Sequence, residues 1–379
     1  MSITVKKQPD AYSFAGNPVP IELETDSDAI IQMDIITGGR TYPVSYYPYR
    51  ESDGIYRVRA DISDYLKFEP VSTLPQGEET ITPLPDFSRH FQVKIHEGDE
   101  ILPLEGLEGH VFYGGIGKRA IQSLAQAGMN MFSYRLAFYQ TNFLFTTRTN
   151  GREITLSRAE LYPFAFIHPG VPLTFVSGTG ERLETAALAA GTAATMDIRK
   201  ILEQFPPETS RIEVHYQGEY AFHFALRPET PAREQYVIRF RNSLGAFEAL
   251  EVTGCATHAP EFSEEDIYET LTAFDFYEER RSRPEHRNTI TVETGYRPRR
   301  DFPFILDMIA SDETYFIHAD GYTFRCHVTA EKFEYRNLMT EPTSVKLQIR
   351  ETVRDRYVTP RTGFDLDRIF DEPYDEEFN

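Results

Sequence analysis

Hydrophobic and polar residues alternate one by one over much of the first 66 residues. Three runs show the alternation, with apolar positions at Val19, Ile21, Leu23; Ile31, Met33, Ile35; and Tyr56, Val58, Ala60. Side chains of a strand point alternately to two faces, so these runs predict strands with one buried face. Paired turn residues, Gly38 with Gly39 and Asp53 with Gly54, lie between the runs. Short strands separated by turns predict a small β-sandwich over residues 1–70.

A Pro-rich stretch follows this first unit. It contains Pro70, Pro75, Pro83 and Pro85. We interpret 71–85 as a linker, because clustered prolines interrupt regular structure. Alternation resumes at Phe91, Val93 and Ile95, and residues 86–235 are expected to form a second β-rich unit. One helix is predicted within it over 116–127, with Gly128 as its C-terminal stop.

Residues 236–360 predict a third unit that mixes strands with helices. Asp301 is placed to cap a helix over 302–310, and strands are expected on both sides of it. Ser263 begins a pattern similar to a capping box that would open a short helix, although residues 270–279 could equally form a strand. Residues 242–245 predict a turn in which Gly245 supplies a positive φ.

A short sequence echo links the first two units. Residues 59–70 and 195–207 share an Asp, an Ile and a Leu at matching positions, namely Asp61, Ile62, Leu66 and Asp197, Ile198, Leu202. In both segments a strand is expected to run into a helical turn that the Asp caps. Two related sandwich modules would explain the echo, and so would chance.

Composition agrees with a sheet-rich fold. Hydrophobic residues make up 40% of the 379 residues, and 28 Phe and 22 Tyr supply all the aromatic content because Trp is absent. Phe, Tyr, Val, Ile and Thr fit the pleated, half-buried surface of a sheet. We therefore expect a mainly β, multi-domain protein of fibronectin- or immunoglobulin-like β-sandwich modules, with a few short helices and an acidic C-terminal arm.

The net charge of the chain indicates which class of macromolecule it binds. The chain has 59 Asp and Glu against 39 Lys and Arg, a formal net charge of −20. Nucleic-acid binding needs clustered Lys and Arg that displace counterions, so proteins are the expected partners and nucleic acid is not. No run approaches the roughly 18 apolar residues of a membrane span, and no leader pattern follows the N-terminal lysines. Synthesis in the cytoplasm without membrane insertion is expected.

Two apparent binding sites are better explained by structure. The Gly-rich stretch 113–119 is similar to a P-loop, but Phe112 replaces a required glycine and Arg119 replaces the Ser or Thr that holds magnesium. Cys255, His258, Cys326 and His327 are zinc-type ligands. Adjacent strand residues point to opposite faces, so Cys326 and its neighbour cannot readily share an ion, and a buried core thiol is favoured. No cofactor and no metal are expected.

No catalytic set emerges from the spacing. His215 and His223 alternate with apolar strand faces and are expected to point outward. The other histidines are scattered, so no Ser/His/Asp or Cys/His triad can be nominated. Carboxylate clusters such as Glu278-Glu279 fit a solvated face, and without Trp platforms for sugars a glycosidase is disfavoured. We expect the chain not to be an enzyme.

The last residues, 361–379, combine acids with large apolar side chains. Seven acids accompany two arginines there. The apolar residues are candidate partner-docking residues: Phe364, Leu366, Ile369, Phe370, Tyr374 and Phe378. We expect this acidic C-terminal arm to become ordered on a partner, with packing on its own domain or remaining free as alternatives.

Several segments resemble a group of virion structural, tail-associated proteins of Bacteroidetes phages and prophages. They are residues 3–10 with 13–17, residues 236–245 with 252–254, and the later order of a strand at 291–294, a helix at 302–310 and a last strand ending near 354–356. The resemblance implies a structural role in the virion, in the tail or tail tip. It transfers no active-site residue.

The expected function is therefore a phage virion structural protein that is made in the host cytoplasm and incorporated in the tail. Its expected partners are other virion proteins and further copies of itself in a symmetric homo-oligomer. A module that binds a glycan or a host receptor is the first alternative. A polysaccharide hydrolase is the second.

Overall fold

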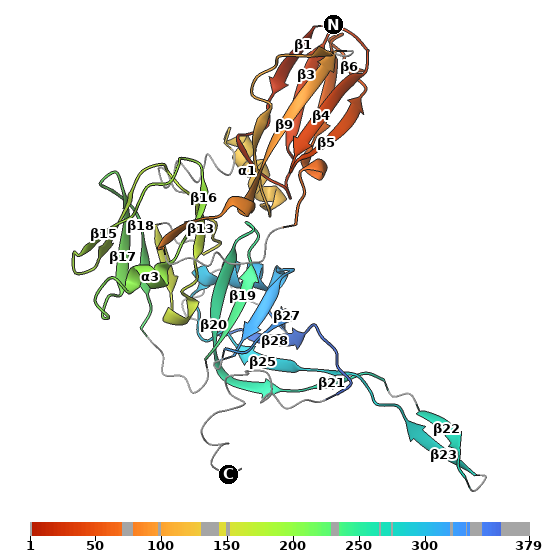
Figure 1. Ribbon diagram of the computed structural model, residues 1–379, viewed down its shortest axis with the longest axis vertical. Coiled ribbons are helices and arrows are strands. Elements are labelled where there is room, and N and C mark those ends of the chain that lie inside the picture. Colours follow the sequence, from red (N-terminus) through yellow and green to blue (C-terminus); the bar gives the residue numbers. More distant parts are fainter. Residues whose placement is uncertain are drawn as a thin grey trace, which may run out of the picture.

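The computed structural model describes residues 2–69, 79–97, 100–129, 144–148, 152–228, 235–264, 267–273, 276–318, 321–330, 332–333 and 343–357. They form an elongated molecule with the first strands at one end and a projecting hairpin toward the other (Figure 1). Several separate sheets and a few short helices make up the described residues, so the expectation of a mainly β, multi-domain fold is confirmed.

The first unit is a β-sandwich of a four-stranded sheet, β1-β3-β7-β6, and a six-stranded sheet in which β2-β11-β9-β4-β5 are neighbours and β10 pairs with β9. The strands are β1 (Ile3–Lys7), β2 (Tyr12–Phe14), β3 (Pro20–Thr25), β4 (Ile31–Thr37), β5 (Arg40–Tyr46), β6 (Tyr49–Arg50), β7 (Tyr56–Asp61), β9 (Ser88–Glu97), β10 (Glu100–Ile101) and β11 (Glu108–Phe112). The predicted alternation is confirmed, because the apolar positions of β3 and β4 and, in β7, Val58 and Ala60 are buried in one core, while Tyr56 is partly exposed.

Strand pairing divides the chain differently from the expected boundaries at 71–85 and 86–235. β9, which carries Phe91, Val93 and Ile95, pairs with β4, and β11 pairs with β9 and β2. Residues 88–112 therefore complete the first sandwich. Local alternation predicts a strand but does not specify its partner, because pairing depends on distant segments.

The linker interpretation of 71–85 is also incomplete. β8 (Ile81–Pro83) pairs with β16 (Ala193–Met196) of the second unit. The chain thus leaves the first sandwich, adds one strand to the second unit, and returns to the first. The first two units are interlaced rather than consecutive along the chain.

The second unit packs the sheet β12-β18-β17-β14-β15 against the smaller sheet β13-β16-β8 around one core. Its other strands are β12 (Glu153–Leu156), β13 (Phe164–Ile167), β14 (Leu173–Ser177), β15 (Arg182–Glu184), β17 (Arg211–Tyr216) and β18 (Glu219–Leu226). Phe166, Phe175 and Phe224 are fully buried between the sheets.

The echo between 59–70 and 195–207 corresponds to a shared local structure. β7 leads into the 3₁₀ turn η1 (Ser63–Tyr65), and β16 leads into the short helix α3 (Ile198–Leu202). Asp61 Oδ1 accepts a hydrogen bond from the Ser63 N–H at 3.0 Å. Asp197 Oδ1 accepts from the N–H groups of Arg199 at 3.1 Å and Lys200 at 3.4 Å. The predicted capping is confirmed for Asp197, which is the N-cap residue of α3. At η1 the N-cap residue is Ile62, whose side chain makes no capping hydrogen bond, so Asp61 bonds to the turn from one position before the cap.

Asp197→Ala is expected to lower the free energy of unfolding by about 1 kcal/mol, because it removes the acceptor for two N–H groups at the start of α3. Asp197→Asn keeps an acceptor oxygen and should lose much less. Denaturant unfolding of the two variants measures the difference. Equal losses would mean that the carboxylate does not act as a cap.

The third unit is a closed barrel in which β19-β20-β25-β28-β27-β26 follow one another around the ring. Its strands are β19 (Gln235–Arg241), β20 (Phe247–His258), β25 (Thr289–Glu293), β26 (Thr314–Ile317), β27 (Thr323–Ala330) and β28 (Lys346–Glu351). The predicted helix is present as α4 (Phe302–Ala310), which buries Phe302, Phe304, Ile305 and Met308 in the barrel core. The Asp301 side chain makes no capping hydrogen bond to α4, so that detail of the prediction is wrong.

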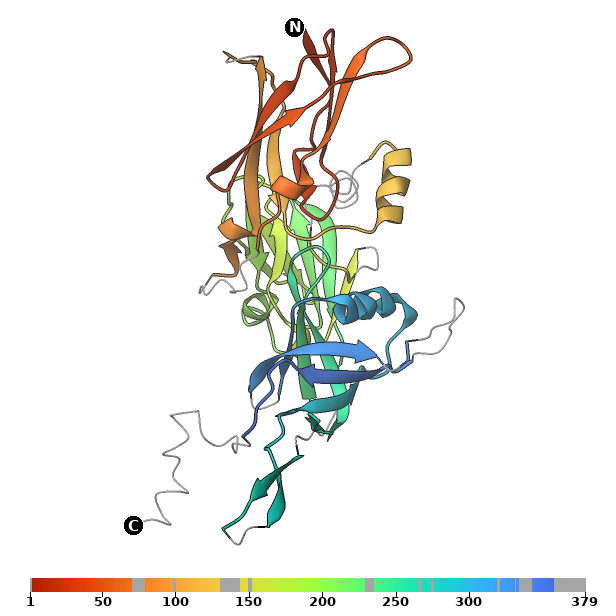
Figure 2. The ribbon, with the colours of Figure 1, turned by 90° about the vertical axis from the view of Figure 1, so that its right-hand side faces the viewer.

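Two other helix predictions have opposite outcomes. α1 (Lys118–Gln126) lies within the expected 116–127 and is followed by Gly128 at φ +68°. Of the two alternatives left open after Ser263, a short helix and a strand, the helix is wrong and the strand is confirmed as β22 (Ile267–Leu271) and β23 (Tyr277–Arg281). Figure 2 shows α1 beside the first sandwich and α4 beside the barrel. Within the described part of the chain, no helix has the length and apolarity to cross a membrane.

Candidate functional site at the junction of the three units

Residues 242–246, here called the junction loop, connect β19 to β20 at the place where the three units meet. Asn242 Oδ1 accepts hydrogen bonds from the N–H groups of Leu244 at 3.1 Å and Ala246 at 3.0 Å. Gly245 has φ +88°, in the left-handed region that glycine adopts without strain. The turn predicted for 242–245 is therefore confirmed.

Residues 113–115, which follow the last strand of the first unit, contact the junction loop directly through their main chain. The Gly115 N–H donates to the Ser243 carbonyl at 2.7 Å. Gly114 has φ +96°, and a Cβ there would collide with the Ser243 carbonyl, just as a Cβ on Gly245 would collide with the Tyr113 carbonyl. The Gly-rich stretch 113–119 thus serves as a docking turn. Its glycines permit close approach between two units, consistent with the interpretation against a P-loop.

A cluster of phenylalanines fills the space under the loop. Phe145, from the second unit, is fully buried and its ring lies 4.8 Å from Phe87 and 4.9 Å from Phe112. Leu244 and Ala246 of the junction loop belong to the same cluster. Side chains from all three units therefore share one small apolar core, and separating any unit would expose it to water.

Glu248 is a buried carboxylate at this place. It accepts hydrogen bonds from the Thr146 hydroxyl at 2.5 Å, the Asn242 side-chain amide at 2.7 Å and the Thr147 N–H at 3.2 Å. Burial raises the pKa of Glu248, an effect that Arg148 and these hydrogen bonds oppose. Glu248 thereby connects the junction loop of the third unit to residues 146–147 of the second.

A second buried carboxylate, Glu160, binds three arginines. Its Oε2 accepts from Arg148 Nη1 at 3.1 Å and from Arg227 Nη2 at 2.7 Å. Its Oε1 accepts from Arg297 Nη2 at 3.1 Å and from the Glu251 N–H at 2.9 Å. The side chain has no exposed surface. Burial alone would raise the pKa of Glu160, but the three guanidinium groups hold it well below its usual range.

This buried charge cluster joins the second unit to the barrel. Glu160 and Arg227 belong to the second unit, whereas Arg297 and Glu251 belong to the third. Arg297 Nη2 also donates to the Glu251 carbonyl at 2.6 Å. Arg148 lies with its guanidinium carbon 3.7 Å from the centre of the Phe304 ring on α4. Such clusters fix one arrangement strongly, because breaking them leaves buried charge without a partner.

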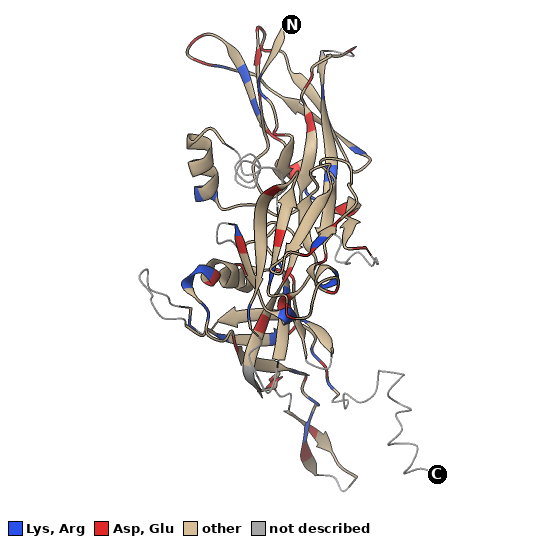
Figure 3. Ribbon diagram, turned by 90° about the vertical axis from the view of Figure 1, so that its left-hand side faces the viewer, with Lys and Arg blue, Asp and Glu red and all other residues tan. Residues whose placement is uncertain are grey.

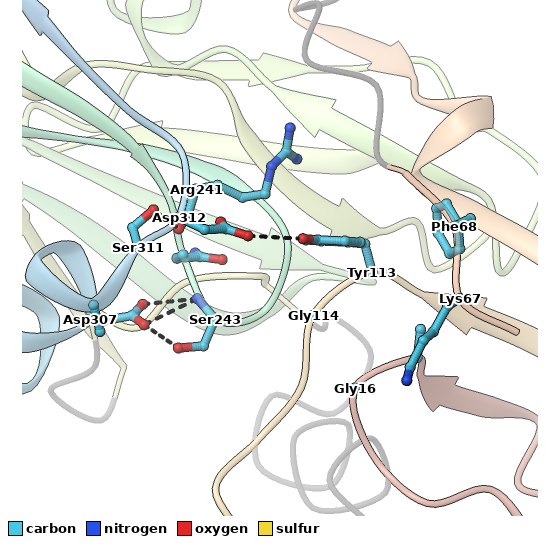
Figure 4. Close-up of a pocket in the computed structure, with 13 residues that line it drawn as sticks. Gly16, Lys67, Phe68, Tyr113, Gly114, Arg241, Ser243, Asp307, Ser311 and Asp312 are labelled. Atoms are coloured by element: carbon cyan, nitrogen blue, oxygen red, sulfur yellow. Dashed lines mark hydrogen bonds between the residues drawn. The ribbon is translucent and has the colours of Figure 1, made fainter. Parts of the chain in front are cut away.

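An open pocket of about 470 Å³ lies beside the junction loop, between the first sandwich and the barrel. Figure 4 shows its polar side chains bound to one another. Asp307 accepts hydrogen bonds from the Ser243 N–H and hydroxyl and, at 3.0 Å, from the Thr147 hydroxyl. The Tyr113 hydroxyl donates to Asp312 at 3.3 Å. These carboxylates hold loops together at the wall of the pocket.

Cys326 is a core thiol, as expected. It is 2% exposed in the barrel, with its Sγ 3.7 Å from the Thr314 hydroxyl. Burial raises the pKa of Cys326 to about 12. Nothing is described for the Cys255 side chain, and among the described residues no group of three or more His, Cys, Asp and Glu is arranged to hold a metal ion.

Iodoacetamide at pH 8 is therefore expected to leave Cys326 unmodified in the folded protein, since the thiolate is the reactive form. After denaturation the same cysteine should be alkylated completely. Mass spectrometry of the peptide that contains residue 326 reports both states. Rapid alkylation of the native protein would contradict a buried thiol.

The two strand histidines point outward, as the sequence predicted. His215 and His223 lie on the outer face of the second unit and are partly exposed; His215 contacts Glu213 at 3.0 Å, and His223 contacts the Tyr220 hydroxyl at 2.7 Å. The candidate docking residues of the C-terminal arm lie outside the described residues: Phe364, Leu366, Ile369, Phe370, Tyr374 and Phe378.

Sequence analysis missed the Glu160 cluster. Its members are far apart in the chain, and charged residues are normally expected at the surface. One local signal was available, because Ser157 and Glu160 have capping-box spacing. The structure shows the Ser157 N–H donating to Glu160 Oε2 at 3.0 Å. That pattern indicates a helix start, but it does not predict three arginines.

Comparisons with known proteins add little to this description. No protein-family model and no curated protein matches the chain. A solved structure from work on host cell surface retention of a 1.5-MDa bacterial ice-binding adhesin is 10% identical, covering 74% of this chain and 95% of that chain. Its TM-score is 0.14, so the likeness carries no argument about this protein.

Proposed function

We propose that this chain is a structural component of a phage particle, a tail or tail-tip protein that holds its neighbours in a fixed geometry. The observation that carries the proposal is the junction, where three β units share one apolar core and buried carboxylates bind groups from two units. A scaffold needs such fixed relative orientation. Domains joined by small polar contacts would move instead.

The resemblance to tail-associated phage proteins supports the same proposal. Residues 236–245, the most specific segment of that resemblance, form most of β19 and the first part of the junction loop. The segment by which the chain resembles the group is thus part of what fixes the three units together. Contacts with virion proteins and with further copies of the chain follow from this role.

Mass spectrometry of purified particles tests the proposal directly. We expect peptides from this chain in particles banded on a density gradient, at a constant ratio to a major virion protein across the gradient. A non-structural protein expressed from the same genome serves as the control and should be absent. Absence of this chain from intact particles would refute the virion role.

A glycan- or receptor-binding role is the second candidate, favoured by the pocket beside the junction loop. Phe68 and Tyr113 place two aromatic rings 6.2 Å apart at its edge, and Lys67 and Asp312 add charge. Aromatic faces with nearby polar groups suit a sugar. Binding to a glycan array that Tyr113→Ala abolishes, with an unchanged melting temperature, would favour this role over a purely structural one.

A further inference from the structure

The hairpin formed by β22 (Ile267–Leu271) and β23 (Tyr277–Arg281), here called the hairpin arm, projects from the barrel. Figure 1 and Figure 2 both show it extending away from the body of the molecule. Within the described residues its two strands pair only with each other. A short ladder between β21 (Glu261–Phe262) and β24 (His286–Arg287) connects it to the barrel.

The hairpin arm exposes large apolar side chains. Ile267, Leu271 and Tyr277 are 61%, 57% and 68% exposed. The register places Leu271 directly opposite Tyr277, and Ile267 shares their face because alternate residues of a strand point the same way. A two-stranded hairpin on its own is marginally stable in water. Apolar residues gathered on such a projection are typical of an interaction site.

The charge of the hairpin arm indicates what covers it. Its two arginines, Arg280 and Arg281, lie at the base of the arm, opposite Tyr268 and Ile267, and the outer residues 269–279 contain four acids and neither Lys nor Arg. Glu269 lies directly opposite Glu279 on the face that carries Leu271 and Tyr277. Like charges facing each other across two strands are destabilising. Figure 3 shows acidic segments toward the free end of the hairpin and basic ones nearer the barrel.

We propose that the hairpin arm, residues 267–281, docks on another protein, in an apolar groove bordered by Lys and Arg. The groove would cover Ile267, Leu271 and Tyr277, and its cations would relieve the repulsion between Glu269 and Glu279. A second copy of this chain is the poorer occupant, because each copy carries a net charge of −20. This inference deepens the proposed function, and rests on it only in expecting the groove to belong to a virion protein.

The hairpin arm is long enough to contribute a substantial part of a specific contact. Its 15 residues, 267–281, compare with the roughly 20–30 residues that one side of a standard protein interface contributes. Among the described residues the two strands pair only with each other, and side chains on both of their faces are exposed. The partner can therefore enclose the arm rather than meet it on one side.

Selection from a displayed library of short random peptides tests the proposal independently of any particle. The full-length chain is the target, and Glu278→Lys/Glu279→Lys is the variant. We expect enriched peptides that combine Lys or Arg with Leu, Phe or Ile, and a loss of affinity for the variant of at least about tenfold. Affinity for the wild type should fall as salt increases, since surface charges are screened.

Two controls separate the arm from the rest of the chain. Glu203→Lys/Glu208→Lys makes the same charge change at exposed positions of the second unit and should bind the peptides as the wild type does. Leu271→Ser/Tyr277→Ser removes apolar contacts without changing charge and should weaken binding about as much as the arm charge variant. Equal melting temperatures confirm that the body of each variant is folded.

Three outcomes would overturn the proposal. One is enrichment of peptides that bind the arm variant and the wild type equally. Another is enrichment of acidic or uncharged peptides. The third is arm-dependent dimerisation of the pure chain in analytical ultracentrifugation, which would make a second copy the occupant. None of these results bears on whether the chain is present in particles, so failure here is distinguishable from failure of the proposed virion role.

Discussion

Replacing Glu160 with Gln is expected to lower the free energy of unfolding by about 3–5 kcal/mol, among the largest effects of any single change in this chain. The variant keeps the shape of the side chain but leaves Arg148, Arg227 and Arg297 close together without the carboxylate that they share. Guanidinium denaturation measures the loss. Glu203→Gln, at an exposed position of the second unit, is the matched control and should change stability by less than about 0.5 kcal/mol.

The pH dependence gives this prediction a second readout. The pKa of Glu160 is depressed in the folded chain, so its stabilising contribution is complete above the unfolded pKa of about 4.3. That contribution is lost as the pH falls from there through the folded pKa. The stability difference between wild type and Glu160→Gln should therefore shrink on acidification below about pH 4.3. A difference that stayed constant in acid would contradict a depressed pKa.

Glu248 should behave in the opposite way. Its pKa is raised by burial, so its protonation as the pH falls favours the folded form. The stability comparison between the wild type and Glu160→Gln must therefore keep Glu248 unchanged in both proteins. Glu248→Gln on its own should make stability fall more steeply in acid than in the wild type, because it removes a group that gains stability there.

Gly245→Ala is expected to destabilise the junction by more than about 2 kcal/mol. A non-glycine residue at φ +88° costs about 1–3 kcal/mol by itself, and the new Cβ would also collide with the Tyr113 carbonyl. The cost arises at the contact between the first unit and the barrel. Limited proteolysis and calorimetry should therefore show the first unit separating from the other two before they unfold.

Gly218→Ala is the matched control for Gly245→Ala. Gly218 has φ +84°, nearly the same backbone conformation, but a Cβ there meets nothing within 4 Å. Both variants carry the backbone cost, and only Gly245→Ala carries the collision between units. If the two variants lost equal stability and showed the same proteolysis pattern, the close approach of Gly245 to Tyr113 would not hold the units together.

Local sequence signals predicted local structure well. The alternation at Ile21 and Leu23 identified a strand and its buried face, and the glycine at 245 identified a turn with positive φ. Strand partners were not predictable in the same way. Phe91 carries the alternation of its strand but no information that β4, distant in sequence, is its neighbour.

The contacts that join the three units were even harder to predict from the sequence. Glu160 and Arg297 form an ion pair across 137 positions, and neither residue differs in its sequence surroundings from a solvated one. The hairpin arm shows the opposite difficulty. Glu278 and Glu279 were interpreted as part of a solvated face, and they are exposed, but the sequence did not indicate that they lie beside exposed apolar residues on a projecting pair of strands.

The course of the chain between the first two units restricts how this gene can recombine. β8 belongs to the second unit but is encoded between β7 and β9 of the first. A crossover that exchanged only residues 1–70 would leave β9 and β11 facing foreign strands. Viable hybrids are therefore expected to inherit residues 1–228 as one block, together with the barrel residues that the junction holds against them.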